Sequence, residues 1–402
     1  MVNLHSITTA HVFPSIAVDN IGNIYITWTA VTNSGNDWNI WFAISTDGGS
    51  SFSSPKVLTT LNGCVYPAIA VDNNYVYVFY GDLSSYPAAN YYFTRSIDYG
   101  LNFSSPIQIN DAPCIDEINY SNLTTIAFDS AGIVHLAWVD GRRLNAKGDI
   151  FYAKSINNGQ NFGINKMVND STQTASDSIQ YYPSIAIGTT NKVLIGFIDY
   201  RLNKQSPRLY LATSSNGGNT FATETLFAAH SENTNYFDLA ACSNGKVVAA
   251  LTTSYQSDFG IWMFESINDG ASFSSPIALS DTMNMLSKDV KIVMDEQQLI
   301  YTSWIDNRDS IWHVYFTKTS LGTSVLKHNS EIQARLFPNP SNASFNIDLA
   351  EKQEEIKLSI TNMQGQLIFE KNYRNTNLIE LDIPLRTCLL YTSDAADEED
   401  SV

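Results

Sequence analysis

Apolar and polar residues alternate in short runs along most of this chain, a pattern typical of half-buried β-strands. Residues 124–128 (TTIAF) are apolar almost throughout, whereas residues 133–138 (IVHLAW) and 149–155 (DIFYAKS) alternate. Clusters of Asp, Asn, Gly and Ser separate these runs and are short enough for tight hairpins. A fourth run, of which residues 106–110 are an example, lies at the outer end of such a group. Each group is therefore predicted to form a four-stranded antiparallel meander.

This group of strands occurs six times. The residues that end its first strand lie 53, 57, 59, 55 and 52 residues apart, at Asp19, Asp72, Asp129, Gly188, Ser243 and Asp295. A period in the fifties is close to that of a four-stranded propeller blade. One such sheet cannot bury both of its faces, whereas six packed radially can. The pattern predicts an all-β fold in which residues 1–330 form a six-bladed β-propeller.

A second repeat, Ser-x-Asp/Asn-x-Gly-x-x-Phe, follows the third strand of five groups. The short Asp or Asn side chain can accept hydrogen bonds from backbone N–H groups two residues on, and the glycine permits a positive φ. We expect the phenylalanine to insert between adjacent sheets. A calcium site is disfavoured, because one side-chain ligand per turn is far too few. The defining residues are Ser45, Asp47, Gly49 and Phe52; Ser96, Asp98, Gly100 and Phe103; Ser155, Asn157, Gly159 and Phe162; Ser214, Asn216, Gly218 and Phe221; and Ser266, Asn268, Gly270 and Phe273.

The two faces of the predicted propeller differ in the turns that they carry. The turns after the first and third strands share one face, so a binding site is expected on the other face, among the second-to-third turns and the links between blades. An Asp-x-Arg sequence ends the second strand of three blades, at Arg142, Arg201 and Arg308. These arginines are candidates for gripping a ligand carboxylate. The favoured alternative is a structural ion pair, because a residue repeated at one blade position usually serves the blade.

The links between blades contain acidic and tyrosine residues of a more varied kind. They supply candidates for an acid/base pair and for an aromatic platform under a sugar ring: Asp116, Glu117, Asp177, Tyr182, Glu232 and Tyr236. The alternative, which we favour, is that such residues are simply common in exposed loops of an anionic protein. No cysteine spacing or histidine pair indicates a metal site, and no cofactor is expected. The sequence does not decide whether Cys64 and Cys114 form a disulfide.

Composition narrows the possible partners. The net charge of −17 argues against binding to a nucleic-acid backbone, which requires clustered Lys and Arg. The chain contains no run of about eighteen apolar residues, so no membrane span is predicted. We expect a monomer.

The repeated turn resembles the Asp-box, or BNR, repeat, and residues 1–330 resemble the sialidase-like six-bladed propeller superfamily. That resemblance implies a substrate carboxylate held by three arginines, a tyrosine–glutamate nucleophile and an aspartate acid/base. The first of these arginines belongs to an F/Y-R-I-P motif, but here the corresponding stretch is HVFPSIAVD and no arginine precedes Arg95. We therefore expect noncatalytic recognition of a glycan or another extracellular ligand. An exo-acting, sialidase-like glycoside hydrolase is the alternative, and an architectural surface protein is the second alternative.

The character of the chain changes near residue 331. Residues 337–342 (FPNPSN) and 359–368 (SITNMQGQLI) resemble the C-terminal sorting domain of the type IX secretion system of Bacteroidetes. The resemblance implies a small β-sandwich-like domain over residues 331–385, recognition by the secretion machinery, and a secreted or cell-surface location outside the outer membrane of a Gram-negative bacterium. After Pro384 the family pattern is lost, so we expect an incomplete sorting domain, a non-native or disordered tail at 386–402 and incomplete native termini.

Overall fold

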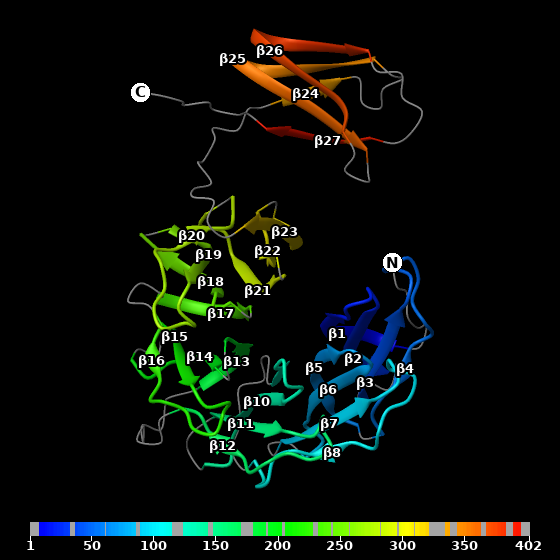
Figure 1. Cartoon of the computed structure of the whole chain (residues 1–402), viewed down its shortest axis with the longest axis vertical. Coiled ribbons are helices and arrows are strands. Elements are labelled where there is room, and N and C mark those ends of the chain that lie inside the picture. Colours follow the sequence, from blue (N-terminus) through cyan, green and yellow to red (C-terminus); the bar gives the residue numbers. More distant parts are fainter. Residues whose placement is uncertain are drawn as a thin grey trace. The chain divides into compact units, whose positions relative to one another are not determined.

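The computed structural model describes residues 8–320 and 334–394 with short gaps (Figure 1). The gaps are 33–36, 61, 86–88, 115–123, 144–147, 170–179, 190–191, 203–205, 228–231, 243, 257, 282, 296, 309, 338–343, 363–366 and 383–388. The chain divides into two compact units, Met1–Thr323 and Ser324–Val402.

Six antiparallel sheets, blades 1 to 6, follow one another along the first unit around a common centre (Figure 1). Blade 1 contains β1 (Thr8–Val18), β2 (Ile24–Thr32), β3 (Trp38–Ser45) and β4 (Lys56–Val57). Blade 2 contains β5 (Cys64–Asp72), β6 (Tyr75–Asp82), β7 (Asn90–Ser96) and β8 (Ile107–Gln108). Blade 3 contains β9 (Thr124–Phe128), β10 (Val134–Asp140), β11 (Asp149–Ser155) and β12 (Lys166–Met167).

The second half of the first unit repeats this arrangement. Blade 4 contains β13 (Gln180–Ile187), β14 (Val193–Asp199), β15 (Arg208–Ser214) and β16 (Thr225–Leu226). Blade 5 contains β17 (Glu232–Ala241), β18 (Val247–Tyr255), β19 (Asp258–Ser266) and β20 (Ile277–Ala278). Blade 6 contains β21 (Ser287–Met294), β22 (Leu299–Asp306) and β23 (His313–Ser320). The strands pair in chain order in every blade, which confirms the prediction of an all-β, six-bladed propeller.

The core of the propeller lies between neighbouring blades. Every residue of β10 and β14 is buried, because the blades on either side cover both faces of these strands. One apolar cluster extends from blade 2 to blade 5, and a second joins blades 1 and 2. These strands therefore read as continuous apolar runs, as expected for sheets buried on two sides.

The two end blades each keep one exposed apolar face. On blade 1, Ile16 and Val18 are 63% and 57% exposed, and they pair with Ile26 and Ile24 of the same face. On blade 6, Val314 and Phe316 are 73% and 65% exposed. The equivalent faces between the other blades are buried. These two faces are exposed because no neighbouring blade covers them among the described residues.

The repeated turn between the third and fourth strands has the same hydrogen bonds in each of its five copies. In the first, the Ser45 hydroxyl donates to Asp47 at 2.7 Å and accepts from the Gly49 N–H at 2.9 Å. Asp47 accepts from the N–H of Ser51, four residues on rather than the two expected from the sequence. The longer span arises because the serine hydroxyl occupies the nearer N–H groups and leaves the carboxylate to close the wider loop.

The phenylalanine of this turn packs against the preceding blade. Phe103 meets Phe42 of blade 1, with ring centroids 5.0 Å apart, and Phe162 meets Phe93 of blade 2 at 4.9 Å. The turn glycine lies in the same contact, since a Cβ added at Gly159 would come within 2.6 Å of the Phe93 ring. The turn thus joins adjacent blades as well as adjacent strands.

The second unit is one four-stranded sheet. Its strands are β24 (Ala334–Phe337), β25 (Ser344–Asn362), β26 (Leu367–Asp382) and β27 (Leu389–Asp394). β25 pairs with all three others, with an irregular register between Asp348 and Gln353. Ile347, Leu358 and Ile379 are among the residues of its small core. β27 lies in the range that the sequence pattern set apart as a tail.

Candidate functional site

A β-bulge interrupts the first strand of blades 1, 2, 4 and 6 at equivalent positions. The bulges contain Phe13, Tyr66, Tyr182 and Asp289, whose φ angles are 54°, 53°, 57° and 53°. Positive φ is rare for bulky residues, and a bulge redirects the side chain that it carries. These four side chains therefore point in directions that differ from the regular alternation of side chains along a strand.

The redirected side chains meet near the axis of the propeller. Phe13 and Tyr66 lie with ring centroids 4.0 Å apart, and Tyr182 packs edge-on against Tyr236 of blade 5 at 5.4 Å. The Tyr182 hydroxyl donates to the Asp289 carboxylate at 3.4 Å. This contact joins blade 4 to blade 6 and bypasses blade 5, which requires a position where the inner strands converge. We call these five residues the channel-mouth cluster.

Burial and charge keep the tyrosines of the cluster protonated. Burial, and after it the carboxylate of Asp289, raises the pKa of Tyr182 far above its usual value. Burial raises the pKa of Tyr66 to about 12. Protonated phenols present hydrogen-bond donors and aromatic faces to a ligand, whereas a tyrosine nucleophile needs a lowered pKa or an adjacent base.

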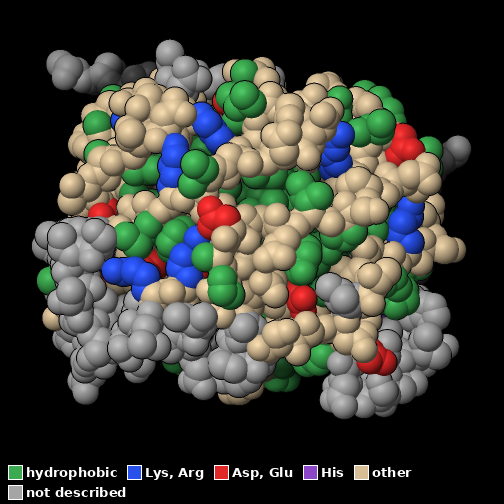
Figure 2. All heavy atoms as spheres, turned by 90° about the horizontal axis from the view of Figure 1, so that it is seen from below, with side chains coloured by type: hydrophobic (Ala, Val, Ile, Leu, Met, Phe, Trp, Pro, Cys, Tyr) green, Lys and Arg blue, Asp and Glu red, His purple; other side chains and the backbone are tan. Residues whose placement is uncertain are grey.

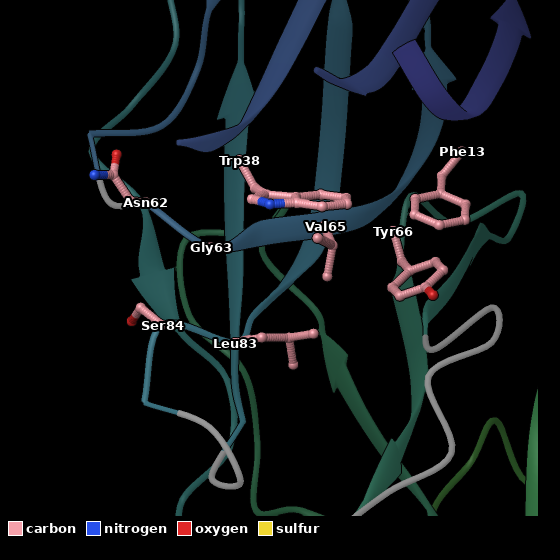
Figure 3. A pocket seen from close by; sticks show the side chains of 8 residues that line it. All are labelled: Phe13, Trp38, Asn62, Gly63, Val65, Tyr66, Leu83 and Ser84. Carbon is pink, nitrogen blue, oxygen red and sulfur yellow. The ribbon is translucent and has the colours of Figure 1, made fainter. Parts of the chain in front are cut away.

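A cavity of about 560 Å³ adjoins the cluster between blades 1 and 2. Figure 3 shows the Trp38 ring and Val65 at its middle, Phe13 and Tyr66 on one side, and Asn62 and Ser84 on the other. Gly63 and Leu83 complete the lining. Ligand sites have volumes of roughly 300–1,000 Å³ and combine apolar walls with a few polar groups, as this cavity does.

Each of the three repeated arginines is held by two carboxylates. The shortest contact to the carboxylate two residues earlier is 2.7 Å for Arg142, 2.5 Å for Arg201 and 2.6 Å for Arg308. The second partners are Asp111, Glu224 and Asp281, respectively. Each guanidinium also stacks on a ring of its own blade, at 4.0 Å from Phe151, 4.3 Å from Tyr210 and 3.6 Å from Tyr315. These contacts occupy the groups that would otherwise grip a ligand carboxylate.

The structure brings together two of the candidates from the links between blades. Tyr182 and Tyr236 belong to the channel-mouth cluster. The backbone of Glu232 pairs with Ser254 at the start of β17, while its side chain lies outside the described part of the chain. Asp116, Glu117 and Asp177 also lie outside the described residues.

Three members of the cluster were missed at the level of sequence: Phe13, Tyr66 and Asp289. The signal for the aromatic members is an aromatic residue directly before proline at the head of an inner strand, in VFPSI, VYPAI and YYPSI. Proline restricts the residue before it, so this repeated pair marks a backbone irregularity. For Asp289 the sequence carries no comparable signal.

Two further predictions concern cysteines and metals. Cys64 and Cys114 are both buried free thiols in the structure, and Cys114 accepts a hydrogen bond from the Gly141 N–H at 2.8 Å. Within the described ranges, no three His, Cys, Asp or Glu side chains are grouped so that they could hold a metal ion.

The described part of the chain also contains no helix with the length and hydropathy of a membrane span. On the face drawn in Figure 2, Lys and Arg side chains form separate small groups among apolar and uncharged ones.

Comparison with protein families identifies one segment. Residues 335–385 match the family described as the secretion system C-terminal sorting domain. Such a domain directs export by the type IX secretion system, so the protein is secreted to the cell surface or the extracellular space. A search of curated protein sequences gave no match.

Solved structures similar to the chain share its propeller. A protein of unknown function from Dyadobacter fermentans is 14% identical, with a TM-score of 0.54 over 77% of this chain and 94% of its own. The leech intramolecular trans-sialidase is 10% identical, with a TM-score of 0.56 over 79% and 69%. The α-L-arabinanase of Penicillium chrysogenum is 10% identical, with a TM-score of 0.55 over 78% and 94%. The chain therefore joins a six-bladed propeller of the sialidase-like fold to a C-terminal secretion sorting domain.

Proposed function

We propose that the protein is a secreted recognition module that binds a glycan at the channel-mouth cluster without cleaving it. The observation that carries this proposal is the convergence of aromatic side chains from four blades at the head of the central channel. Aromatic faces stack on the C–H faces of sugar rings, and protonated phenols donate to sugar hydroxyls. Bulged, positive-φ backbone at these positions adds support, because such backbone gathers at functional sites.

The engagement of the arginines supports a noncatalytic role. A sialidase-like mechanism uses three arginines on the substrate carboxylate, but each repeated arginine here already contacts two carboxylates of the protein. Releasing a guanidinium to a ligand would leave a buried Asp140, Asp199 or Asp306 without its cation, at a cost of several kcal/mol, on the order of 3–5.

One contact favours an exo-acting glycoside hydrolase as the second candidate. Tyr182 and Asp289 place a phenol beside a carboxylate at 3.4 Å, which is the pairing that a tyrosine nucleophile and its base require. In that case Asp289 would accept the phenolic proton as the Tyr182 oxygen bonds to the anomeric carbon. The glycosidic C–O bond would break at the same time, and the departing oxygen would take a proton from water. The raised pKa of Tyr182 argues against this alternative, since it disfavours the phenolate.

Binding and turnover measured on the same protein distinguish these functions. The full chain is applied to a glycan array and, in parallel, to fluorogenic glycosides that include a sialoside. The variants are Tyr182→Ala, which removes the ring, and Tyr182→Phe, which removes only the hydroxyl. Tyr99→Ala is the matched control, because Tyr99 is 42% exposed in a turn on the opposite face.

We expect the protein to bind glycans on the array and to cleave none of the glycosides. Tyr182→Ala should weaken the binding at least tenfold, and Tyr99→Ala should leave it unchanged. If the protein cleaves a glycoside and Tyr182→Phe abolishes the cleavage, the protein is a glycoside hydrolase and the proposal is wrong. Silence in both assays would reject glycan recognition and leave the architectural alternative.

A further inference from the structure

We propose that the cavity between blades 1 and 2 is a subsite for an uncharged sugar unit, so that the protein selects neutral over acidic glycans. This inference rests on the proposed function and specifies its ligand. The cavity is continuous with the channel-mouth cluster because Phe13 and Tyr66 belong to both. A glycan stacked on the cluster therefore extends into it.

The cavity has one aromatic side and one polar side. The rings of Phe13 and Tyr66 pack against each other at one side, tilted by 34°, and the Trp38 ring lies across the middle (Figure 3). Asn62 and Ser84 are exposed at the other side, where they offer an amide and a hydroxyl. Sugars have the same two characters, an apolar C–H face and a rim of hydroxyls.

The charges around the cavity disfavour an anionic ligand. None of the eight described residues that line it is charged. The walls come from residues 13–84, and the only Lys or Arg in that part of the sequence is Lys56. The Lys56 ammonium group donates to the carbonyls of Gly100 and Leu101 in a turn of the opposite face. A carboxylate lies beside the polar side of the cavity, because Asp82 accepts a hydrogen bond from the Ser84 N–H at 2.9 Å. A sugar carboxylate or sulfate placed here would lose hydration without gaining a cation.

The backbone holds the cavity open. The Gly63 N–H donates to the Trp38 carbonyl at 3.0 Å, and the Gly63 carbonyl accepts from the Leu83 N–H at 2.9 Å. One glycine thus joins the start of β3 to the end of β6 and fixes the two walls relative to each other. Gly63 has φ +99°, and an added Cβ would lie 2.7 Å from the Ser84 nitrogen, so this junction requires glycine.

The test compares neutral and acidic ligands on the full chain. An array carries lactose, arabinan and glucan oligosaccharides beside 3′-sialyllactose, oligogalacturonate and sulfated oligosaccharides. The strongest ligand is then titrated against Trp38→Ala, which removes the central ring, and Ser84→Trp, which fills the cavity from an exposed position. Tyr99→Ala is again the matched control, because its ring is 42% exposed in a turn of the opposite face. Because Trp38 is partly buried, thermal melting is used to check that Trp38→Ala still folds. Ser84→Trp does not need this check, because Ser84 is exposed.

We expect neutral oligosaccharides to bind. Trp38→Ala and Ser84→Trp should each reduce the affinity at least tenfold, and Tyr99→Ala should change it less than twofold. Binding confined to acidic glycans would overturn this inference and leave the proposed function intact. So would neutral binding that Tyr182→Ala weakens but neither cavity variant affects. An array without any binding would refute the proposed function, and this inference with it.

Discussion

The arginines that end the second strands offer a direct test of structural against ligand-binding roles, and Arg201 is the most informative of them. Its Nε donates to Asp199 at 2.6 Å and a terminal nitrogen donates to Glu224 at 2.7 Å. The two carboxylate side chains are 0% and 1% exposed. In Arg201→Met the side chain keeps its length and loses its charge, so the buried carboxylates of Asp199 and Glu224 both lose their contact with this guanidinium.

The expected cost follows from that burial. Removing one partner of a buried ion pair costs about 3–5 kcal/mol, because the remaining charge is desolvated and unpaired. Loss of the stacking on Tyr210 adds about 0.5–2 kcal/mol. Arg308→Met is the matched comparison, since its second partner Asp281 is 73% exposed and is hydrated when the guanidinium is lost. We expect Arg308→Met to cost about 1–3 kcal/mol less than Arg201→Met.

Urea unfolding followed by tryptophan fluorescence measures both variants. The midpoints of the propeller transition are compared, because a chain of two units need not unfold in one step. Adding Glu224→Gln to Arg201→Met removes one of the two carboxylates that lost this guanidinium, and it is expected to recover part of the lost stability. An unchanged midpoint in Arg201→Met, together with lost glycan binding, would refute the structural role and make Arg201 a ligand residue.

Three other predictions concern the turn glycines, a buried histidine and the cluster tyrosine. Gly159→Ala is expected to cost about 1–3 kcal/mol more than Gly49→Ala in urea unfolding, because both have positive φ but only the first places a Cβ 2.6 Å from a neighbouring blade's Phe93 ring. Burial lowers the pKa of His135 from 6.5 to about 4, so the unfolded chain takes up this proton first as the pH falls. Stability is therefore present above pH 6.5 and falls by about 3 kcal/mol toward pH 4, and the pH profile of His135→Gln should lack this contribution. Tyr182→Phe is expected to change stability by less than about 1 kcal/mol, since it removes one long hydrogen bond of 3.4 Å, and a larger loss in thermal melting would contradict this.

The periodicity of the sequence determined the architecture of the propeller. Alternation every second residue and turn residues such as Asp47 and Gly49 act over a few residues, where chain geometry alone decides the outcome. The repetition of this unit predicted six blades because a single sheet cannot bury both faces. The sorting domain was likewise recognisable from a contiguous segment, residues 335–385.

The candidate site was decided by the tertiary structure. Tyr182 and Asp289 are 107 residues apart in the chain and meet only because bulges redirect both side chains toward the axis. The second partner of Arg201, Glu224, directly precedes β16 and cannot be found from an i, i+2 pattern. Local periodicity tells which face of a strand a residue occupies, but a bulge changes that face and the curvature of the ring selects which blades meet. Residues that converge from different blades therefore cannot be paired from the sequence of one chain.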